Sequence, residues 1–272
     1  MTKIIAIANQ KGGVGKTTTS INLAASFAVM KRQVLLIDLD PQGNTTGGSG
    51  VDKSQLVWAA QHVLLRETEL AQAVITTQSG YDLLPTYHEL IVAEVELMQM
   101  AEREFQLKKI LIEAATHYDF ILIDCPPSLN ILTVNALAAA HSVLVPIQCE
   151  YFALEGLSGL LNTIEQIRTS TNPHLQIEGL LRTMYDGRNR LAVDVSAQLL
   201  KHFPNRVYHT VIPRNVRLAE APSHGLPVIQ YDEKSQGAIA YMALAGEILR
   251  KAELQDAEPS AAIGSTAELA SV

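Results

Sequence analysis

The sequence predicts an α/β fold, in which a mostly parallel, twisted sheet carries helices on both of its faces. Apolar runs rich in β-branched residues alternate with amphipathic segments along the chain, and this alternation is typical of parallel strands joined by crossover helices. A glycine-rich turn at residues 10–18 separates the first strand from the first helix. The chain of 272 residues is 47% hydrophobic and 18% charged, so we place a single domain at residues 1–251.

Each element is predicted from its local pattern. Continuous apolar runs predict strands, and apolar residues spaced three or four apart predict helices. The strands are expected at residues 3–9, 33–38, 81–85, 118–124, 142–147, 175–183 and 207–212. The helices are expected at residues 18–28, 56–65, 70–75, 88–115 with a break near 102–104, 130–140, 150–169, 190–202 and 235–251. Residues 45–51 are expected to be mobile, and the acidic tail at 252–272 is expected to be disordered.

The glycine-rich turn has the features of a phosphate-binding loop (P-loop). Its glycines let successive N–H groups point at an anion, and the start of the following helix adds partial positive charge. Lys16 is expected to reach the β- and γ-phosphates, and the hydroxyl of Thr17 to bind Mg²⁺. The residues expected to contact nucleotide here are Lys11, Gly12, Gly13, Val14, Gly15, Lys16, Thr17 and Thr18. The turn therefore predicts a P-loop NTPase fold with ATP and Mg²⁺ as its ligands.

The loop departs from the usual P-loop pattern at its start. Gln10 stands where the pattern has glycine, and Lys11 adds a second lysine. One phosphate tail needs only one lysine from within its own loop. A lysine on the outer side can neutralise charge on a nucleotide held by a facing subunit, so Lys11 is a candidate catalytic residue together with Lys16.

Three aspartates end neighbouring strands. Asp124 follows an apolar strand in the Walker B manner, and we expect it to bind Mg²⁺ with Thr17. Asp38 is expected to support the Mg²⁺ shell or the loop lysine, and is counted as a metal ligand. Asp40, just beyond the same strand, is expected to orient the attacking water and is the third catalytic candidate. The alternative for Asp40 is a plain Asp-Pro-Gln-Gly turn.

Composition limits the other partners. The net charge is −7, but residues 180–251 hold ten Lys or Arg against six Asp or Glu, so an anionic partner should meet this basic third. No run of eighteen apolar residues occurs, so we expect no membrane contact by a spanning helix. The first strand leaves no room for a signal peptide, and two cysteines give no disulfide framework, which together favour the cytoplasm.

The motifs together resemble the ParA/Soj family of chromosome and plasmid partition ATPases, in the deviant Walker A group that also contains MinD-like proteins. The matching stretches are residues 11–18, 38–44, 124–128 and 211–225, and the similarity covers about residues 2–251. The resemblance implies that Lys11 reaches across a homodimer closed on ATP, and that Pro213 and Asn215 contact the adenine. Asn215 has an alternative role as a helix cap.

The resemblance also implies a cycle and its partners. The ATP-bound dimer would bind double-stranded DNA without sequence preference, and a ParB/Spo0J-like centromere-binding protein would stimulate hydrolysis and release. The protein would then be cytoplasmic and associated with the nucleoid. Arg188 and Arg217 match DNA-contacting positions of the family. Further candidate DNA contacts in the basic third are Lys201, Lys234, Arg250 and Lys251, each with the alternative of a solvated surface charge.

Three other functions were weighed. A MinD-like switch at a membrane surface needs a basic amphipathic terminal helix, and the tail at 252–272 has no Lys or Arg. An iron–sulfur carrier on the same scaffold needs cysteines at ligand spacing, whereas Cys125 and Cys149 lie far apart. Positioning of another cargo by a ParA-like cycle stays open.

Overall fold

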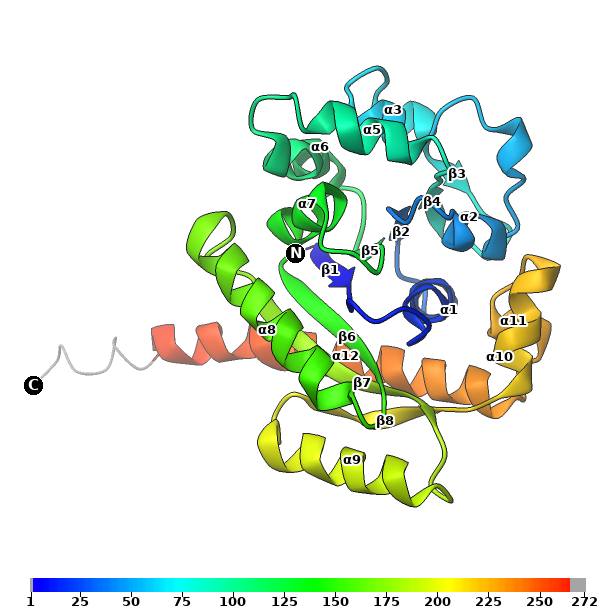
Figure 1. Ribbon diagram of the computed structural model, residues 1–272, viewed down its shortest axis with the longest axis vertical. Helices are drawn as coiled ribbons and strands as arrows, with labels where there is room; N and C mark the ends of the chain where they lie inside the picture. The colour runs from blue at the N-terminus through cyan, green and yellow to red at the C-terminus, as the bar shows by residue number, and fades with distance from the viewer. Residues whose placement is uncertain (1, 265–272) are drawn as a thin grey trace, which may run out of the picture.

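A computed structural model describes residues 2–264, except for the side chains of residues 113 and 255–264. In this part of the chain, eight strands form one sheet in the order β3-β4-β2-β5-β1-β6-β7-β8 (Figure 1). Their bounds are β1 (Lys3–Ile7), β2 (Val34–Asp38), β3 (Ile75–Thr76), β4 (Asp82–Leu84), β5 (Phe120–Asp124), β6 (Ser142–Gln148), β7 (Gln176–Tyr185) and β8 (Val207–Pro213). Every neighbouring pair is parallel except β3 with β4, which confirms the predicted fold class.

Helices cover both faces of the sheet. One core contains buried residues of α3 (Ala60–Leu64), α5 (Leu90–Leu97), α6 (Gln106–Ala114), α7 (Ile131–Ala139), α8 (Ala153–Ser170) and α9 (Arg190–His202). The opposite core contains those of α1 (Lys16–Val29), α10 (Val216–Glu220), α11 (Val228–Tyr231) and α12 (Gln236–Gly264). The central strands β1, β2 and β5 are buried on both faces, which explains why they read as continuous apolar runs. The predicted long helix does break, with a 3-10 turn at Arg103–Phe105 between α5 and α6.

The segment expected to be mobile is folded. Residues Asn44–Gly48 form the short helix α2, and Thr45 and Thr46 are fully buried. A glycine- and threonine-rich stretch lacks apolar periodicity, so its order comes from hydrogen bonds to distant side chains that local pattern does not reveal. The remaining short elements are β3, α4 (Leu70–Ala73), α10, α11 and two 3-10 turns at Lys53–Gln55 and Ala221–His224; of these, only α4 was expected.

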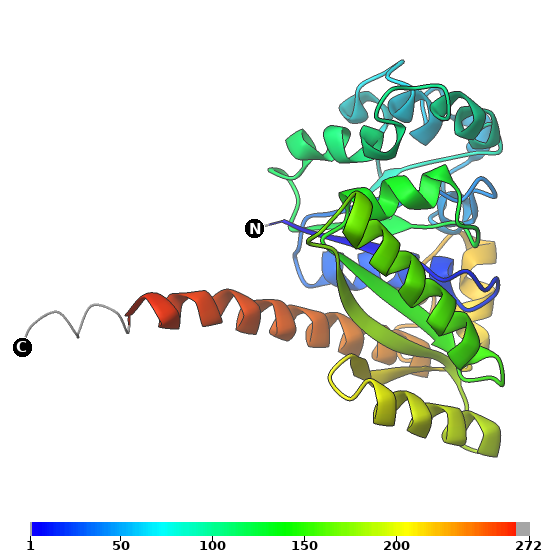
Figure 2. The ribbon, with the colours of Figure 1, turned by 60° about the vertical axis from the view of Figure 1, so that its left-hand side comes forward.

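The last helix is longer than predicted. It was expected to end at Lys251, with a disordered tail after it, but α12 continues to Gly264. The first residues after Lys251 are Ala-Glu-Leu-Gln-Asp-Ala, which contain no helix breaker, and α12 continues through Pro259 to Gly264. Figure 2 shows α12 projecting well beyond the rest of the chain. The remainder of the predicted tail, residues 265–272, lies outside the described residues.

Candidate nucleotide-binding site

The glycine-rich turn lies at the carboxyl edge of the sheet, where the ends of the central strands meet. The register places Asp124 level with Ile7 and with Asp38, so β1, β2 and β5 end side by side. Among the described residues, Gly13 and Gly15 have positive φ of 74° and 89°, which L side chains rarely adopt. A Cβ added at Gly12 or Gly13 would meet nothing within 4 Å. The loop therefore faces open space, as a phosphate cradle must.

The two loop lysines occupy different environments. Lys16 is only 7% exposed, its Nζ donates to the Lys11 carbonyl at 3.2 Å, and burial lowers its pKa. The Lys11 side chain is 40% exposed, and its Nζ forms an ion pair with Glu150 Oε2 at 2.6 Å. Lys16 thus lies inside the loop and Lys11 on its outer side, and the separate roles predicted for the two lysines stay predictions.

Hydroxyl groups surround the Asp124 carboxylate. Oδ2 accepts hydrogen bonds from Thr17 Oγ1 at 2.9 Å and Thr45 Oγ1 at 2.6 Å, and Oδ1 accepts one from Ser20 Oγ at 2.9 Å. Asp124 is fully buried. The pairing of a threonine hydroxyl with a carboxylate at the P-loop suits Mg²⁺, which takes a few oxygen ligands from protein and the rest from phosphate and water. Sequence reasoning missed Ser20 and Thr45.

Asp38 is bound to its own turn. Its Oδ2 accepts from Thr46 N at 2.8 Å and Thr46 Oγ1 at 2.7 Å, and its Oδ1 accepts from Asp40 N at 3.2 Å. These bonds engage both of its oxygens and orient the segment from Asp40 to Thr46. The structure thus brings Asp38 beside Asp124 but binds it to backbone and hydroxyl groups, so its assignment as a metal ligand stays a prediction.

Asp40 lies just beyond β2 and is only 9% exposed. Its Oδ1 accepts from Gln42 N at 3.0 Å, which is the turn geometry weighed as its alternative role. Within the described chain, no side chain or backbone group is hydrogen-bonded to Oδ2 of Asp40. Its negative charge is the smallest of the causes that act on the pKa of Asp124, after burial and the hydrogen bonds from Thr45, Thr17 and Ser20. One oxygen of Asp40 therefore remains available to a water molecule.

Asp124 and Asp38 give a testable pH dependence. Burial raises the pKa of Asp124 from 3.8 to about 6. Burial and, next, the charge of Asp124 raise the pKa of Asp38 from 3.8 to about 8. Both groups thus favour folding when protonated, and that contribution is lost as pH rises from the unfolded pKa through the folded one. For Asp124 the loss amounts to about 3 kcal/mol.

We therefore expect the nucleotide-free protein to unfold more readily as pH rises across this window. Thermal unfolding of the wild type and of Asp124→Asn is compared at about pH 4.5 and about pH 7.5. The difference between the two proteins gives the contribution of the Asp124 carboxyl to the pH dependence of stability. The variant should lose less stability over this range than the wild type. Equal losses in the two proteins would contradict the assignment.

The predicted adenine and DNA contacts lie on neighbouring elements. Asn215 caps α10, with its Oδ1 accepting from Arg217 N at 3.0 Å, and Pro213 ends β8 beside Tyr185. Arg188 pairs with Asp186 at 2.8 Å, and Arg217 with Glu220 at 2.9 Å. Arg217 also lies 3.3 Å from Asp232. The side chains of Arg188 and Arg217 are 91% and 50% exposed, and exposed pairs of this kind are weak. Lys234 is exposed at the turn before α12.

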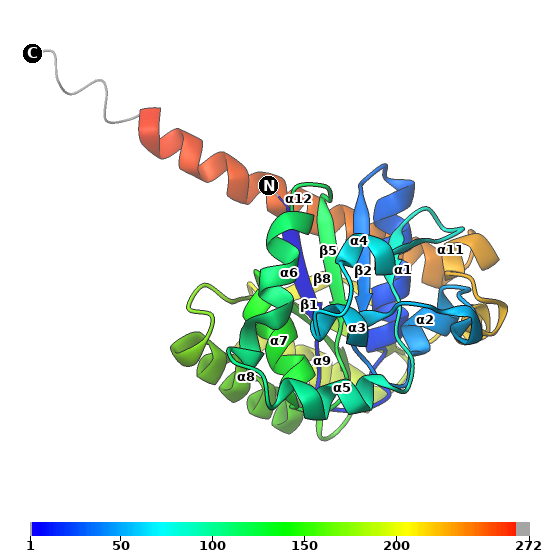
Figure 3. The same ribbon diagram turned by 90° about the horizontal axis from the view of Figure 1, so that it is seen from above.

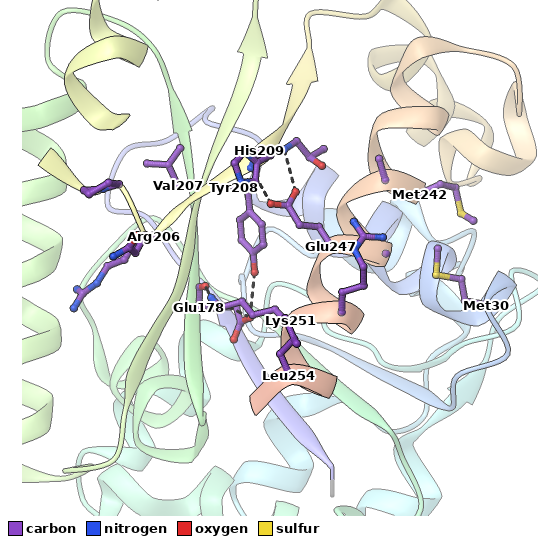
Figure 4. Close-up of a pocket in the computed structure, with 16 residues that line it drawn as sticks. Met30, Glu178, Arg206, Val207, Tyr208, His209, Met242, Glu247, Lys251 and Leu254 are labelled. Carbon is purple, nitrogen blue, oxygen red and sulfur yellow. Dashed lines mark hydrogen bonds and ion pairs between the residues drawn. The ribbon is translucent and has the colours of Figure 1, made fainter. Parts of the chain in front are cut away.

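The remaining basic candidates lie at the opposite edge of the sheet. α9 starts at the carboxyl edge and runs back along the sheet, so Lys201 in its last turn lies at the amino edge. Lys251 donates to the carbonyl of Glu178 and lies 3.8 Å from Glu178 Oε1, near the start of β7 (Figure 4). Arg250 and Lys251 both line a pocket of about 810 Å³. The charge of Lys251 is therefore engaged within the fold, unlike that of the exposed Arg250.

No helix among residues 2–264 is long and apolar enough to cross a membrane. Cys125 and Cys149 are both buried, free thiols, and burial raises the pKa of each. The described residues hold no cluster of three or more His, Cys, Asp or Glu side chains arranged to hold a metal ion.

The fold and the site define the class of the protein: a P-loop nucleotide-binding protein with a deviant, two-lysine loop. The family model described as "AAA domain" matches residues 2–177. The sporulation initiation inhibitor protein Soj of Bacillus subtilis is 50% identical over 91% of this chain and 98% of its own length. The chromosome partitioning protein ParA of Caulobacter vibrioides is 50% identical over 92% of this chain and 94% of its own length. The chain belongs to the ParA/Soj family of partition ATPases.

Solved structures share this fold. A structure described as cobyrinic acid a,c-diamide synthase of Mycobacterium smegmatis, with bound ATP analogue and magnesium, has 40% identity and a TM-score of 0.83, and the match covers 93% of this chain and 96% of that one. The cell division ATPase MinD of Pyrococcus furiosus has 27% identity and a TM-score of 0.75, over 92% of this chain and 99% of that one.

Proposed function

We propose that this ATPase is a partition switch, in which ATP closes a homodimer, the dimer binds double-stranded DNA without sequence preference, and stimulated hydrolysis releases it. The observation that carries the proposal is the position of the two loop lysines. Lys16 is buried within the loop, whereas Lys11 is exposed on its outer side. A single bound nucleotide is served by Lys16, so the outer cation is free to serve a nucleotide in a second copy of the chain.

The chain's own groups divide the work on ATP. The loop amides and Lys16 hold the phosphates, and the charge of α1's N-terminus assists them. Thr17 and Asp124 would hold Mg²⁺, which supplies charge neutralisation of the phosphate oxygens. The free oxygen of Asp40 orients the attacking water. Pro213 and Asn215, on the strand and turn beyond β7, are the proposed adenine contacts.

Dimer formation requires Lys11 to leave Glu150. The ion pair joins two half-exposed side chains, so its contribution is small, about 0.2–1 kcal/mol. Triphosphate in the facing subunit carries more negative charge than one carboxylate and competes well for the ammonium group. The Lys11–Glu150 pair thus keeps the lysine positioned in the single chain without preventing its transfer.

DNA binding follows from doubling the basic surface. The exposed arginines Arg188 and Arg217 are the proposed primary contacts, with Lys201, Lys234 and Arg250 as secondary phosphate contacts. Each phosphate contact adds to the salt dependence of binding, so two copies in one dimer bind far more tightly than one. The partner would be a ParB/Spo0J-like protein bound to the DNA cargo, and the protein would act in the cytoplasm on the nucleoid.

Light scattering combined with DNA-binding anisotropy tests this proposal. An Asp40→Ala variant, blocked in hydrolysis and saturated with Mg·ATP, should scatter as a dimer and bind duplex DNA of arbitrary sequence. The Lys11→Ala, Asp40→Ala double variant should bind ATP but stay a single chain and bind DNA at least about tenfold more weakly. A single-chain state of Asp40→Ala under these conditions would refute the proposal.

A further inference from the structure

Helix α5 exposes an apolar face that nothing in the described chain covers. Ile91, Val92, Val95 and Met98, at its C-cap, are 46–63% exposed. Ile91, Val95 and Met98 follow one another at helical spacing, so they form one stripe roughly 10 Å long. Leu90, Ala93 and Leu97 on the opposite side are buried in the core. Both sides of α5 are therefore apolar, and the outward side is available for a partner.

Acidic residues border this stripe on both sides. At about 100° per residue, Glu94 lies on one side of the stripe, and Glu89 and Glu96 lie on the other. Within residues 2–264, none of these three glutamates forms an ion pair, whereas the nearby Glu102 and Glu104 are paired with Lys109 and Arg103. The α5 face thus combines an apolar centre with an uncompensated negative border.

This charge pattern decides between two occupants. If a second copy of the chain covered the stripe with its own stripe, the glutamates of both copies would be brought together, and such like-charge contacts are unfavourable. A helix with an apolar stripe and flanking Lys or Arg residues satisfies both features of the face. We propose that the α5 face binds a basic amphipathic helix of another protein, whose apolar side packs on this stripe.

Hydrogen bonds connect this face to the catalytic turn. Four residues before α5, the amide of Thr86 donates to Thr46 Oγ1 at 2.9 Å. Thr46 in turn donates to Asp38 Oδ2, and the amide of Asp40 donates to Asp38 Oδ1. Thr86 is fully buried, so the connection is shielded from water. Through these hydrogen bonds, a helix bound at α5 acts on the turn that carries Asp40 and changes the rate of hydrolysis.

Figure 3 shows α5 at the end of the molecule opposite to the one from which α12 projects.

A synthetic peptide tests the docking face without nucleotide or DNA, so its failure is separate from failure of the proposed dimer. The probe is a fluorescent peptide of about 14 residues with leucines at i, i+3, i+4 and i+7 and lysines beside them. It should bind the wild type, and Val95→Asp should weaken binding at least about tenfold. The added aspartate attracts a basic peptide, so the loss can only come from the apolar contact.

The matched control is Ile239→Asp, which changes an equally exposed apolar residue on α12 and should leave binding unchanged. A scrambled peptide of the same composition should not bind, and Glu94→Gln with Glu96→Gln should weaken binding and reduce its salt dependence. Equal binding by Val95→Asp and the wild type would overturn the proposal. So would self-association of the nucleotide-free wild type that Val95→Asp abolishes. Unchanged ATP hydrolysis with peptide bound would refute the connection to Asp40.

Discussion

Replacing Lys16 by alanine is expected to weaken ATP binding by about 100- to 1000-fold, because a buried cation that meets the phosphates makes a strong interaction. Stability should not fall with it. In the nucleotide-free protein, burial lowers the pKa of Lys16, and its ammonium donates to the Lys11 carbonyl. The charges of Asp124 and Asp40 offset this effect of burial only in part, so the ammonium gains its main counter-charge when phosphate arrives. Removing it should leave the free energy of unfolding unchanged or slightly higher.

For Lys16→Ala, titration calorimetry with Mg·ATP measures the ATP affinity, and thermal unfolding without nucleotide measures the stability. Lys11→Ala is the matched control, since it removes an equal side chain from the same loop. It should keep ATP affinity within about threefold of the wild type, because its ammonium pairs with Glu150 and lies outside the loop. If the two variants lost equal ATP affinity, the division between an inner and an outer lysine would be wrong.

The sequence was sufficient for the parts of the site that are built locally. A strand, a glycine turn and a helix follow one another within residues 3–29, so their arrangement is fixed by short-range geometry. The sequence also predicted that Asp38 and Asp124 lie close together, because parallel strands end at the same edge of a sheet. The register confirms this pairing directly.

Contacts over long separations were not predictable from the sequence. Thr45 reaches Asp124 across 79 positions, and Lys11 reaches Glu150 across 139. Nothing in the Gly/Ser/Thr-rich composition of residues 45–51 indicates that its hydroxyls will be buried against carboxylates. The prediction of mobility there was wrong because tertiary hydrogen bonds, rather than apolar periodicity, order the segment.

The basic third illustrates a second limit. Counting charges predicted a basic region at residues 180–251, but the sum cannot distinguish free cations from engaged ones. Lys251 lies against the buried Glu178, whose pKa is held low by Lys3 and neighbouring hydrogen bonds against the opposing effect of burial. Arg188 and Arg217 are ion-paired as well, but their side chains are 91% and 50% exposed, against 35% for Lys251, so exposure rather than charge separates the candidates for DNA contact.

Replacing Asp40 is expected to reduce ATP hydrolysis at least about 100-fold, the usual effect of losing a group that orients or activates water. The structure supplies a matched pair of variants for this test. Asn at position 40 retains the acceptor for Gln42 N, whereas Ala loses it, so only Asp40→Ala should cost stability, about 1 kcal/mol. If the carboxylate itself orients water, both variants should lose hydrolysis equally.

The measurement is phosphate release in a single turnover, with ATP affinity determined in parallel to show that binding is intact. Hydrolysis by the wild type alone should be slow, because the proposed cycle depends on a partner protein to stimulate it. A wild-type rate for Asp40→Asn would assign the water to another group. A loss in Asp40→Ala alone would mean that Asp40 acts by holding the turn from Asp38 to Thr46, and that the free oxygen has no part in the reaction.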